Sequence, residues 1–589
     1  MAYNSYKEDE KSVEKSKLQT LKRLLSYLLK YKWTIVLVLL LMGYCVVVSL
    51  INPLIIESAI DNHIGNKDYI GLYKLLIIAL IINLIATFAI KLRMYIMAKM
   101  CNQILLTIRQ ELYTHIQKLG FKFFDSRPTG KILSRIIGDI NSLKDVLSNC
   151  VTTLIPDFIT VCAVVIIMFY KNPKLAVAAL ISTPFMAIAI TMIQVKAHPR
   201  WQTFRKKSSN LNAFLHEDMS GMKIIHSFTA EKETEETFDE LLNEHKSSFR
   251  SAVRLSDCFG SVIDFSWGFG CVALYFIGIV VLKDENISVG TFLAFGTYIN
   301  MFWQPINNLS NFYNQITTNI AGAERIFEIL DTKPEIEDEK GVVDLPDIKG
   351  EVTFDHVTFG YDEEKVLDDV SFVIKPGETI AIVGPTGAGK STIINLISRF
   401  YDANEGRVLL DGYDVKDVSI ESLRKQVGTM TQENFIFSGT VKDNIRYGKL
   451  DATDEEIIEA AKAVNAHEFI MKLDKGYDTE LLERGGGLSI GQKQILALAR
   501  TMVSKPKILI LDEATSSIDT KTELIVQKGI DKLLSGRTSF VIAHRLSTIK
   551  RADRIFVVDN GKIIEEGNHR QLLEKKGAYY NLYMAQFNV

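Results

Sequence analysis

Six long apolar stretches in the first half of the chain limit what it can fold into. Each reaches or approaches the ~20 residues that a helix needs to cross the hydrocarbon core of a bilayer. The first stretch is too long for a signal peptide and lacks a small-residue cleavage site. The sequence therefore predicts six membrane-spanning helices, at Thr34–Ile56, Leu72–Met97, Val151–Tyr170, Leu175–Val195, Phe259–Leu282 and Val289–Ile316.

The charge distribution predicts which ends of these spans face the cytosol. Residues 1–33 are rich in lysine, and cytosolic flanks of membrane helices carry an excess of positive charge. The loop Glu57–Gly71 has three acidic residues and one lysine, which suits the outer side. We therefore expect a multi-pass membrane protein with its N-terminus in the cytosol. The formal net charge of −2 gives no sign of nucleic-acid binding.

The two inner connections are much longer than the outer ones. Residues 98–150 and 196–258 are charged, have helical patterns, and would extend spans two to five tens of Å into the cytosol. Turn residues interrupt them at Gly120–Gly130 and near His216–Gly221. We interpret both as short elements that lie across the top of a soluble domain, and ordinary cytosolic turns are the alternative.

Polar residues also mark the spans. One face of span six carries a polar stripe that would be costly against lipid, so it lines a substrate pathway or forms hydrogen bonds between helices. Asp157, in the inner leaflet of span three, and Asp264, near the inner edge of span five, are intramembrane carboxylates. Pairing with a loop Lys or Arg, or exposure at the interface, is the favoured expectation for both. In a cavity they would favour cationic substrates. The stripe consists of Asn300, Gln304, Asn307, Asn311, Asn314 and Thr318.

The second half alternates strands and helices around a phosphate-binding loop. A charged, turn-prone linker at 331–349 separates a membrane domain at 1–330 from a soluble domain at 350–589. The loop follows a predicted strand at Thr379–Val383 and precedes a predicted helix at Ser391–Tyr401, whose N-terminus favours phosphate. Its glycines and Lys-Ser pair are spaced to wrap backbone N–H groups around the phosphates of a nucleotide, with Ser391 on Mg²⁺. The candidate ATP-binding residues here are Gly384, Pro385, Thr386, Gly387, Ala388, Gly389, Lys390, Ser391 and Thr392.

An acidic motif further along the chain supplies the groups that hydrolysis needs in addition to the phosphate-binding loop. The apolar strand Ile508–Leu511 ends in Asp512 and Glu513, at the strand end where such sheets bind ligands. Asp512 can hold Mg²⁺, and Glu513 can take the proton of the attacking water.

These motifs, together with Leu488-Ser-Ile-Gly-Gln492, closely resemble those of the ATP-binding cassette (ABC) exporters, and the resemblance covers nearly the whole chain. It implies a multi-domain protein, an all-α transmembrane domain of six helices joined to an α/β phosphate-loop ATPase. Tyr361 matches the aromatic that stacks on adenine, Gln432 the glutamine that contacts Mg²⁺, and His544 the histidine that contacts the γ-phosphate. In that family Ser489, Gly491, Gln492 and Asp519 close the ATP site of the opposite subunit. The resemblance therefore implies a dimer.

The signature motif departs from the family at Ile490, where glycine is usual, whereas Ser489 and Gly491 are intact. The partner implied by the resemblance is a second half-transporter, either another copy of this chain or a different chain. In an unequal pair, this chain would supply Glu513 and His544 to the hydrolysing site. The expected function is ATP-driven export of an amphipathic small molecule, lipid or peptide by alternating access. The alternative is an ATP-gated channel or membrane regulator with the same fold. A soluble DNA-repair type of ABC ATPase is excluded by the six spans.

Overall fold

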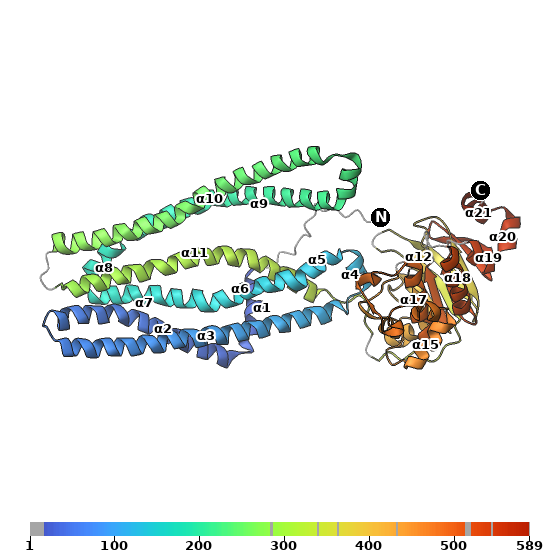
Figure 1. Ribbon diagram of the computed structural model, residues 1–589, viewed down its shortest axis with the longest axis horizontal. Helices are drawn as coiled ribbons and strands as arrows, with labels where there is room; N and C mark the ends of the chain where they lie inside the picture. Colours follow the sequence, from blue (N-terminus) through green and yellow to red (C-terminus); the bar gives the residue numbers. More distant parts are fainter. Residues whose placement is uncertain are drawn as a thin grey trace. The chain divides into compact units, whose positions relative to one another are not determined.

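A computed structural model describes residues 17–282, 287–338, 341–361, 364–431, 434–512, 520–543 and 546–587. The chain divides into two compact units (Figure 1). The first combines Met1–Gln117 with Thr129–Thr332, and the second combines Lys118–Pro128 with Lys333–Val589. The short segment Lys118–Pro128 thus folds with the second unit although its flanking helices belong to the first.

All the regular elements described in the first unit are helices. Its longest helix, α3, has 48 residues, or about 72 Å at the rise of an α-helix. Short π-helical segments extend several of the helices. The elements are α1 (Lys17–Leu29), α2 (Lys32–Ser58), η1 (Ala59–Ile64), α3 (Tyr69–Ile116), α5 (Thr129–Ser134), η2 (Arg135–Asp139), α6 (Ile140–Asn149), η3 (Cys150–Leu154), α7 (Ile155–Lys171), α8 (Pro173–Leu180), α9 (Thr183–Phe228), α10 (Glu231–Phe276), η4 (Ile277–Leu282) and α11 (Val289–Asp331).

Five helical stretches among the described residues are long and apolar enough to cross a membrane: Lys32–Ile64, Tyr69–Ile116, Thr129–Lys171, Pro173–Phe228 and Glu231–Val281. They contain the first four predicted spans and all but the last residue of the fifth. Large side chains such as Leu80, Leu84 and Phe88 on α3 are exposed, which is the surface expected of a helix in lipid. The sixth predicted span is α11, which is less apolar because of its amide side chains. It packs against α2, α6 and α7, with Phe295 and Tyr298 fully buried. That α11 crosses the membrane stays a prediction.

Polar contacts join the ends of α2, α7 and α11 that the sequence places outside. Glu57 forms an ion pair with Lys171 and accepts a 2.9 Å hydrogen bond from the Thr291 hydroxyl. Asp61 accepts a bond from Ser288 and one of 2.9 Å from the backbone N–H of Gly290. The carboxylates of α2 and η1 therefore hold the first turn of α11, where the helix dipole favours negative charge.

A buried ion pair joins α11 to the first long inner connection. Asp139 of η2 accepts hydrogen bonds of 2.9 and 2.6 Å from the guanidinium of Arg325 and one of 3.2 Å from Arg135. Bidentate pairs of this kind fix both partners in one geometry.

The second long inner connection is an uninterrupted hairpin of α9 and α10 (Figure 1). The predicted short element at His216–Gly221 is wrong, because those residues lie within α9. The chain turns instead at Thr229, which has the left-handed φ of +54°, and at Ala230. The close pairing of α9 with α10 along their length explains why Ser220 and Gly221 remain helical.

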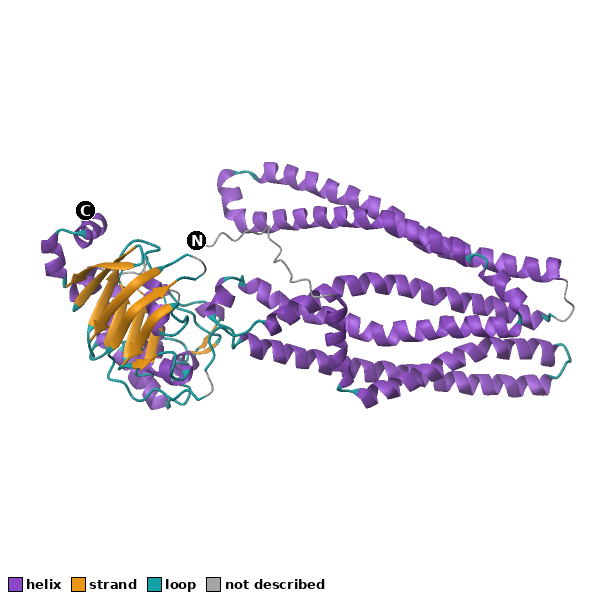
Figure 2. Cartoon of the chain, turned by 180° about the vertical axis from the view of Figure 1, so that it is seen from behind, coloured by secondary structure: helices purple, strands orange, loops and turns teal. Residues whose placement is uncertain are grey.

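The second unit contains three sheets among its described strands (Figure 2). A four-stranded antiparallel sheet has the order β2-β1-β4-β5, and a two-stranded sheet pairs β7 with β8. The larger sheet has the order β12-β11-β3-β10-β9-β6, in which only β12 is antiparallel to its neighbour. The strands are β1 (Val352–Phe359), β2 (Leu367–Ile374), β3 (Thr379–Val383), β4 (Glu405–Leu410), β5 (Tyr413–Asp414), β6 (Val427–Met430), β7 (Gly439–Thr440), β8 (Glu480–Leu481), β9 (Ile508–Asp512), β10 (Thr538–Ile542), β11 (Arg554–Asp559) and β12 (Lys562–Gly567).

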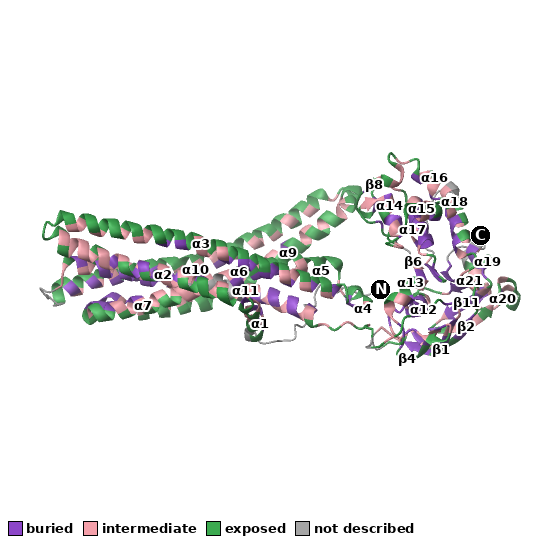
Figure 3. Ribbon diagram, turned by 90° about the horizontal axis from the view of Figure 1, so that it is seen from below, coloured by how far each residue is buried: buried purple, intermediate pink, exposed green. Residues whose placement is uncertain are grey.

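The helices of this unit pack on two faces of the larger sheet, where buried residues concentrate (Figure 3). Successive residues of a strand point to opposite faces. Ala381 and Val383 of β3 accordingly join a core with α14, α15, α17 and α18, whereas Ile380 and Ile382 join a second core with α12 and the antiparallel sheet. The helices are α4 (Phe121–Asp125), α12 (Lys390–Ile397), α13 (Ile420–Gln426), α14 (Val441–Arg446), α15 (Asp454–Ala463), α16 (His467–Ile470), η5 (Gly476–Asp478), η6 (Glu483–Gly485), α17 (Ile490–Val503), α18 (Thr520–Leu534), α19 (Leu546–Arg551), α20 (His569–Lys575) and α21 (Ala578–Phe587).

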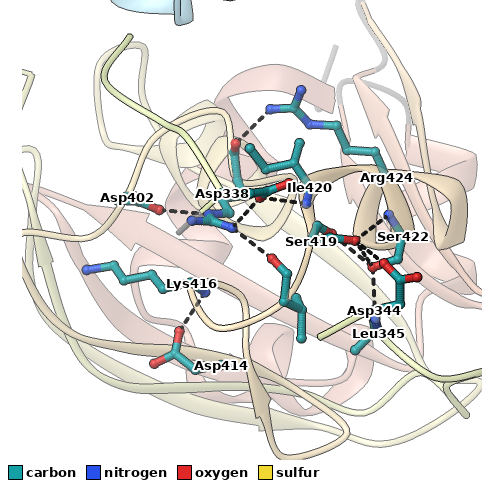
Figure 4. Close-up of polar contacts among 12 residues, drawn as sticks. Asp338, Asp344, Leu345, Asp402, Asp414, Lys416, Ser419, Ile420, Ser422 and Arg424 are labelled. Atoms are coloured by element: carbon teal, nitrogen blue, oxygen red, sulfur yellow. Dashed lines mark hydrogen bonds and ion pairs between the residues drawn. The ribbon is translucent and has the colours of Figure 1, made fainter. Parts of the chain in front are cut away.

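Much of the predicted linker is bound to the second unit (Figure 4). Asp338 accepts a 3.0 Å hydrogen bond from the N–H of Ile420 at the start of α13. The Ser419 hydroxyl donates a 2.5 Å bond to Asp344, and Ser422 accepts a 2.8 Å bond from the N–H of Leu345. These contacts satisfy polar groups on both sides, so the linker is part of this unit's surface rather than a free tether.

Candidate nucleotide-binding site

The phosphate-binding loop connects β3 to α12, as the sequence predicts. Gly384 has a φ of +152°, and a Cβ there would lie 2.1 Å from the carbonyl oxygen of Val558. Gly389 has a φ of +103°, and a Cβ there would lie 2.8 Å from the Leu367 side chain. Only glycine tolerates such close approaches of the backbone. Between them, Pro385, Thr386 and Gly387 are exposed, so the loop presents its backbone to solvent.

Lys390 closes this loop on itself. Its ammonium donates hydrogen bonds of 2.9 Å to the carbonyl of Gly384 and 2.8 Å to that of Pro385. Burial lowers the pKa of Lys390, and the negative charge of Asp512 opposes that shift. The ammonium is therefore held between the loop and the end of β9, within the site where phosphates would bind.

Tyr361 lies beside the first turns of α12. Its hydroxyl is 3.2 Å from that of Thr392 and accepts a 3.4 Å bond from the Asn395 amide. Its ring meets Phe359 and Tyr401 edge to face, each at 5.0 Å between centroids. An aromatic ring is thus fixed at the edge of the phosphate loop, where it could stack on a base.

The phosphate loop and Asp512 lie at the carboxyl ends of parallel strands, at one edge of the larger sheet. β3 leads into the phosphate loop, and Asp512 ends β9, two strands away. In the sequence, one residue, Thr431, separates β6 from Gln432, and one residue, Ala543, separates β10 from His544. Gln432, Glu513, Asp519 and His544 themselves lie outside the described residues. Their roles therefore stay predictions from the sequence.

The oxygen donors at this edge suit Mg²⁺. Ser391 is exposed at the start of α12, and Asp512 is half-exposed. In the described part of the chain no group of three or more His, Cys, Asp or Glu side chains could hold a metal ion. A nucleotide-bound Mg²⁺ does not need one, because it binds through one or two protein oxygens, water and the phosphates.

The signature residues begin α17. Ser489 caps this helix: its Oγ accepts a 3.2 Å bond from the N–H of Gln492, whose side-chain oxygen accepts a 2.8 Å bond from the N–H of Ser489. The Ser489 hydroxyl proton is left available to an acceptor outside the helix. Ser489 is exposed and Ile490 is 57% exposed, whereas Gly491 is buried.

The segment Lys118–Pro128 adds residues that the sequence did not assign to the site. The Tyr401 hydroxyl donates a 2.5 Å bond to Asp125, and Phe121 packs on Phe400 at 4.4 Å between centroids. Lys122 lies 3.8 Å from Glu335. The prediction that Gly120–Gly130 contains a short element on the soluble domain is confirmed for α4. An aromatic pair directly after the phosphate-loop helix was the available signal in the sequence.

Two parts of the chain match known families. Residues 33–306 match the ABC transporter transmembrane region, and residues 367–516 match the ABC transporter family. An ATP-dependent lipid A-core flippase of Syntrophus aciditrophicus is 40% identical over 486 residues, covering 82% of this chain and 81% of that protein. A Staphylococcus aureus ATP-binding/permease protein, whose name proposes multidrug export, is 37% identical over 576 residues, covering 96% of this chain and all of that one. A solved structure described as a bacterial Atm1-family ABC exporter with ATP bound superposes with a TM-score of 0.79, at 28% identity, covering 95% of this chain and 99% of that one.

Proposed function

Because the chain belongs to the ABC transporter family, as an exporter with one transmembrane region fused to one ATPase domain, we propose that it exports amphipathic molecules as one half of a dimer. It is an ATPase coupled to transport, of the multidrug, lipid or fatty-acid type. The observation that best supports coupling is that Lys118–Pro128, which connects two helices of the membrane unit, folds as part of the ATPase unit.

The proposed roles in ATP hydrolysis follow from the sequence motifs, together with the described positions of the phosphate loop and Asp512. Tyr361 stacks on adenine, and the backbone N–H groups of the phosphate loop, from Gly384 to Thr392, hold the phosphates. Lys390 exchanges its two carbonyl partners for phosphate oxygens. Ser391, Gln432 and Asp512 hold Mg²⁺, which neutralises phosphate charge when bound. Glu513 accepts the proton of the attacking water, and His544 contacts the γ-phosphate.

The ATP site requires a second subunit in this proposal. The phosphate loop begins α12 and the signature begins α17, and these helices pack on opposite faces of one sheet. That arrangement supports a site completed by Ser489, Gly491, Gln492 and Asp519 of a partner subunit. Ser489 is exposed, and its hydroxyl proton is available to an outside acceptor. Both properties fit a contact with the γ-phosphate of ATP bound to the partner subunit. The partner is another copy of this chain or a different half-transporter.

Closure of two ATPase units on ATP would drive alternating access. The helices that continue from the spans are long and unbroken, as in α3, α9 and α10, so they can transmit a displacement at one end to the other. ATP favours the outward-open state only to the extent that it binds the closed dimer more tightly. We place the transporter in the bacterial cytoplasmic membrane with the ATPase in the cytosol.

A proteoliposome assay tests this function. The full chain should show ATPase activity that amphipathic substrates stimulate, together with ATP-dependent accumulation of substrate in inside-out vesicles. Glu513→Gln should abolish both and retain ATP binding, because the amide cannot accept the proton. Glu459→Gln makes the same change on an exposed face of α15 and should have no effect. Ion conductance gated by ATP, without substrate transport, would favour the channel alternative.

A further inference from the structure

Asp157 is a carboxylate within a predicted span that bonds to a neutral group and forms no ion pair with the described residues. Asp157, in the first turn of α7, accepts a 3.0 Å hydrogen bond from the amide of Asn308 on α11. Fourteen residues separate Asp157 from Lys171 at the outer end of α7, or about 21 Å along a helix. The carboxylate therefore lies inside a hydrocarbon layer about 30 Å thick, towards its inner side. Asp157 is therefore bonded to a neutral amide and not to a Lys or Arg of a loop, which was one of the two expected environments.

Most other acids that join helices of this unit have a cationic partner. The described contacts of Asp61 and Glu111 are with neutral groups, but both residues lie outside the predicted spans. Asp139 is paired with Arg135 and Arg325, Glu57 with Lys171, and Asp331 with Arg23. Among the ion pairs of the described residues, none includes Asp157. A carboxylate in the membrane interior without a counter-charge is costly and is retained where a pathway uses it.

The helix opposite Asp157 continues as a polar surface. Gln304 and Asn300 lie one and two turns from Asn308 towards the outer end of α11, and both side chains are exposed. Unbonded amides facing lipid are unfavourable, so these side chains face a hydrated path or a partner subunit. The amides at 300, 304 and 308 are neutral and cannot compensate the charge of Asp157. The exposed ring of Phe158, next in the chain, adds an apolar surface beside the carboxylate.

We propose that Asp157, oriented by Asn308, binds the positively charged group of amphipathic organic cations, and that this contact makes the exporter select cations over anions of equal shape. The inference rests on the proposed export function and names its substrate class. An incoming cation supplies the counter-charge that the protein lacks, while its apolar body contacts the surrounding side chains. The pair is attractive only for one sign of charge, so it gives specificity as well as affinity.

Tetraphenylphosphonium and tetraphenylborate test this directly, because they have nearly the same shape and opposite charge. Equilibrium binding of each ion to the purified full chain in lipid nanodiscs, without ATP, keeps the result separate from turnover. We expect wild-type protein to bind the cation at least about tenfold more tightly than the anion, which corresponds to one well-placed charge pair. Asp157→Asn, which keeps shape and removes charge, should abolish that ratio by weakening cation binding alone. Asp157→Glu should keep most of it.

Asp239→Asn is the matched control, since it removes an exposed carboxylate from the part of α10 that lies outside the predicted spans. This variant should keep the ratio of cation affinity to anion affinity within about twofold of the wild-type ratio. A twofold change is much smaller than the about tenfold effect expected of one charge pair. Equal affinity of the wild type for both ions, an unchanged ratio in Asp157→Asn, or equal weakening of both ions in that variant would each overturn the proposal. Loss of export with the binding ratio intact would instead contradict only the proposed function.

Discussion

Tyr401 donates a 2.5 Å hydrogen bond to Asp125, and its ring packs edge to face on Tyr361 at 5.0 Å. The Tyr401 side chain therefore contacts both Tyr361, the predicted adenine-binding residue, and the segment Lys118–Pro128. This segment folds with the ATPase unit, although the helices on either side of it belong to the first unit. A displacement of Tyr361 on nucleotide binding would be felt at Asp125 through this single residue.

Tyr401→Phe should uncouple transport from ATP binding. The variant keeps the ring against Tyr361 and loses only the bond to Asp125, so the affinity for ATP should stay within about twofold while substrate-stimulated ATPase and transport fall severalfold, as expected for an energetic coupling of about 1 kcal/mol. Nucleotide binding and transport measured on the same proteoliposomes would show this. Tyr413→Phe, at an exposed tyrosine of β5, is the control. A proportional loss of ATP affinity in Tyr401→Phe would contradict the relay.

The bond to Asp125 should persist through alkaline pH. Burial, followed by the hydrogen bond to Asp125, raises the pKa of Tyr401 above that of a free tyrosine, about 10. A raised folded-state pKa gives stabilisation that is fully present below the unfolded pKa and is lost as the pH rises through the folded one. The difference in melting temperature between wild type and Tyr401→Phe should thus be constant from about pH 6 to pH 9. A difference that disappears within that range would show that the hydroxyl has ionised.

Gly384→Ala should eliminate nucleotide binding. The new Cβ would lie 2.1 Å from the Val558 carbonyl oxygen, so the loop must move out of register with α12. Gly377→Ala is the control, because its φ of +81° is strained but nothing lies within 4 Å. The control should cost about 1 kcal/mol of stability with unchanged ATP affinity. Binding of a fluorescent ATP analogue and thermal unfolding separate the two effects, and retained ATP binding in Gly384→Ala would contradict the loop geometry.

Ser489→Ala should reduce ATPase activity far more than it reduces stability. Loss of the helix cap costs about 1 kcal/mol, whereas loss of the hydroxyl also removes the proposed donor to the γ-phosphate in the partner's site. Ile490→Gln alters an exposed side chain and should change turnover less than about twofold, in keeping with small effects at exposed positions. Steady-state ATPase rates and melting temperatures of both variants test this. A large gain of activity in Ile490→Gln would indicate that Ile490 weakens the site.

Asp139→Asn should destabilise the membrane unit. The amide cannot pair with two guanidinium groups, and a partly buried Arg325 loses its counter-charge, at a cost of about 1–3 kcal/mol. Thermal unfolding in detergent should show a melting temperature lower by several degrees. Lys425→Gln, which breaks an exposed ion pair with Glu421 on α13, should leave it unchanged. Equal effects of the two variants would show that the Asp139 pair is not structurally important.

The sequence predicts the phosphate loop well because the geometry of this loop is local. β3 has the predicted bounds, and the glycines of the loop occupy the close approaches that the motif requires. The partners of charged side chains depend on tertiary packing and could not be predicted in this way. Asp157 bonds to Asn308, 151 residues away, and Tyr401 to Asp125, 276 residues away. The turn after α9 was misplaced because Gly221 signals a break locally, while packing against α10 keeps it helical.

The position of the Lys390 ammonium has a consequence for which residue could replace it. One nitrogen lies within 2.9 Å of the carbonyl oxygens of both Gly384 and Pro385, so the loop is shaped around a compact point charge. A guanidinium is planar and larger, and it could not take that place without displacing the two carbonyls. Arginine, although it carries the same charge, is therefore not an equivalent residue at this position.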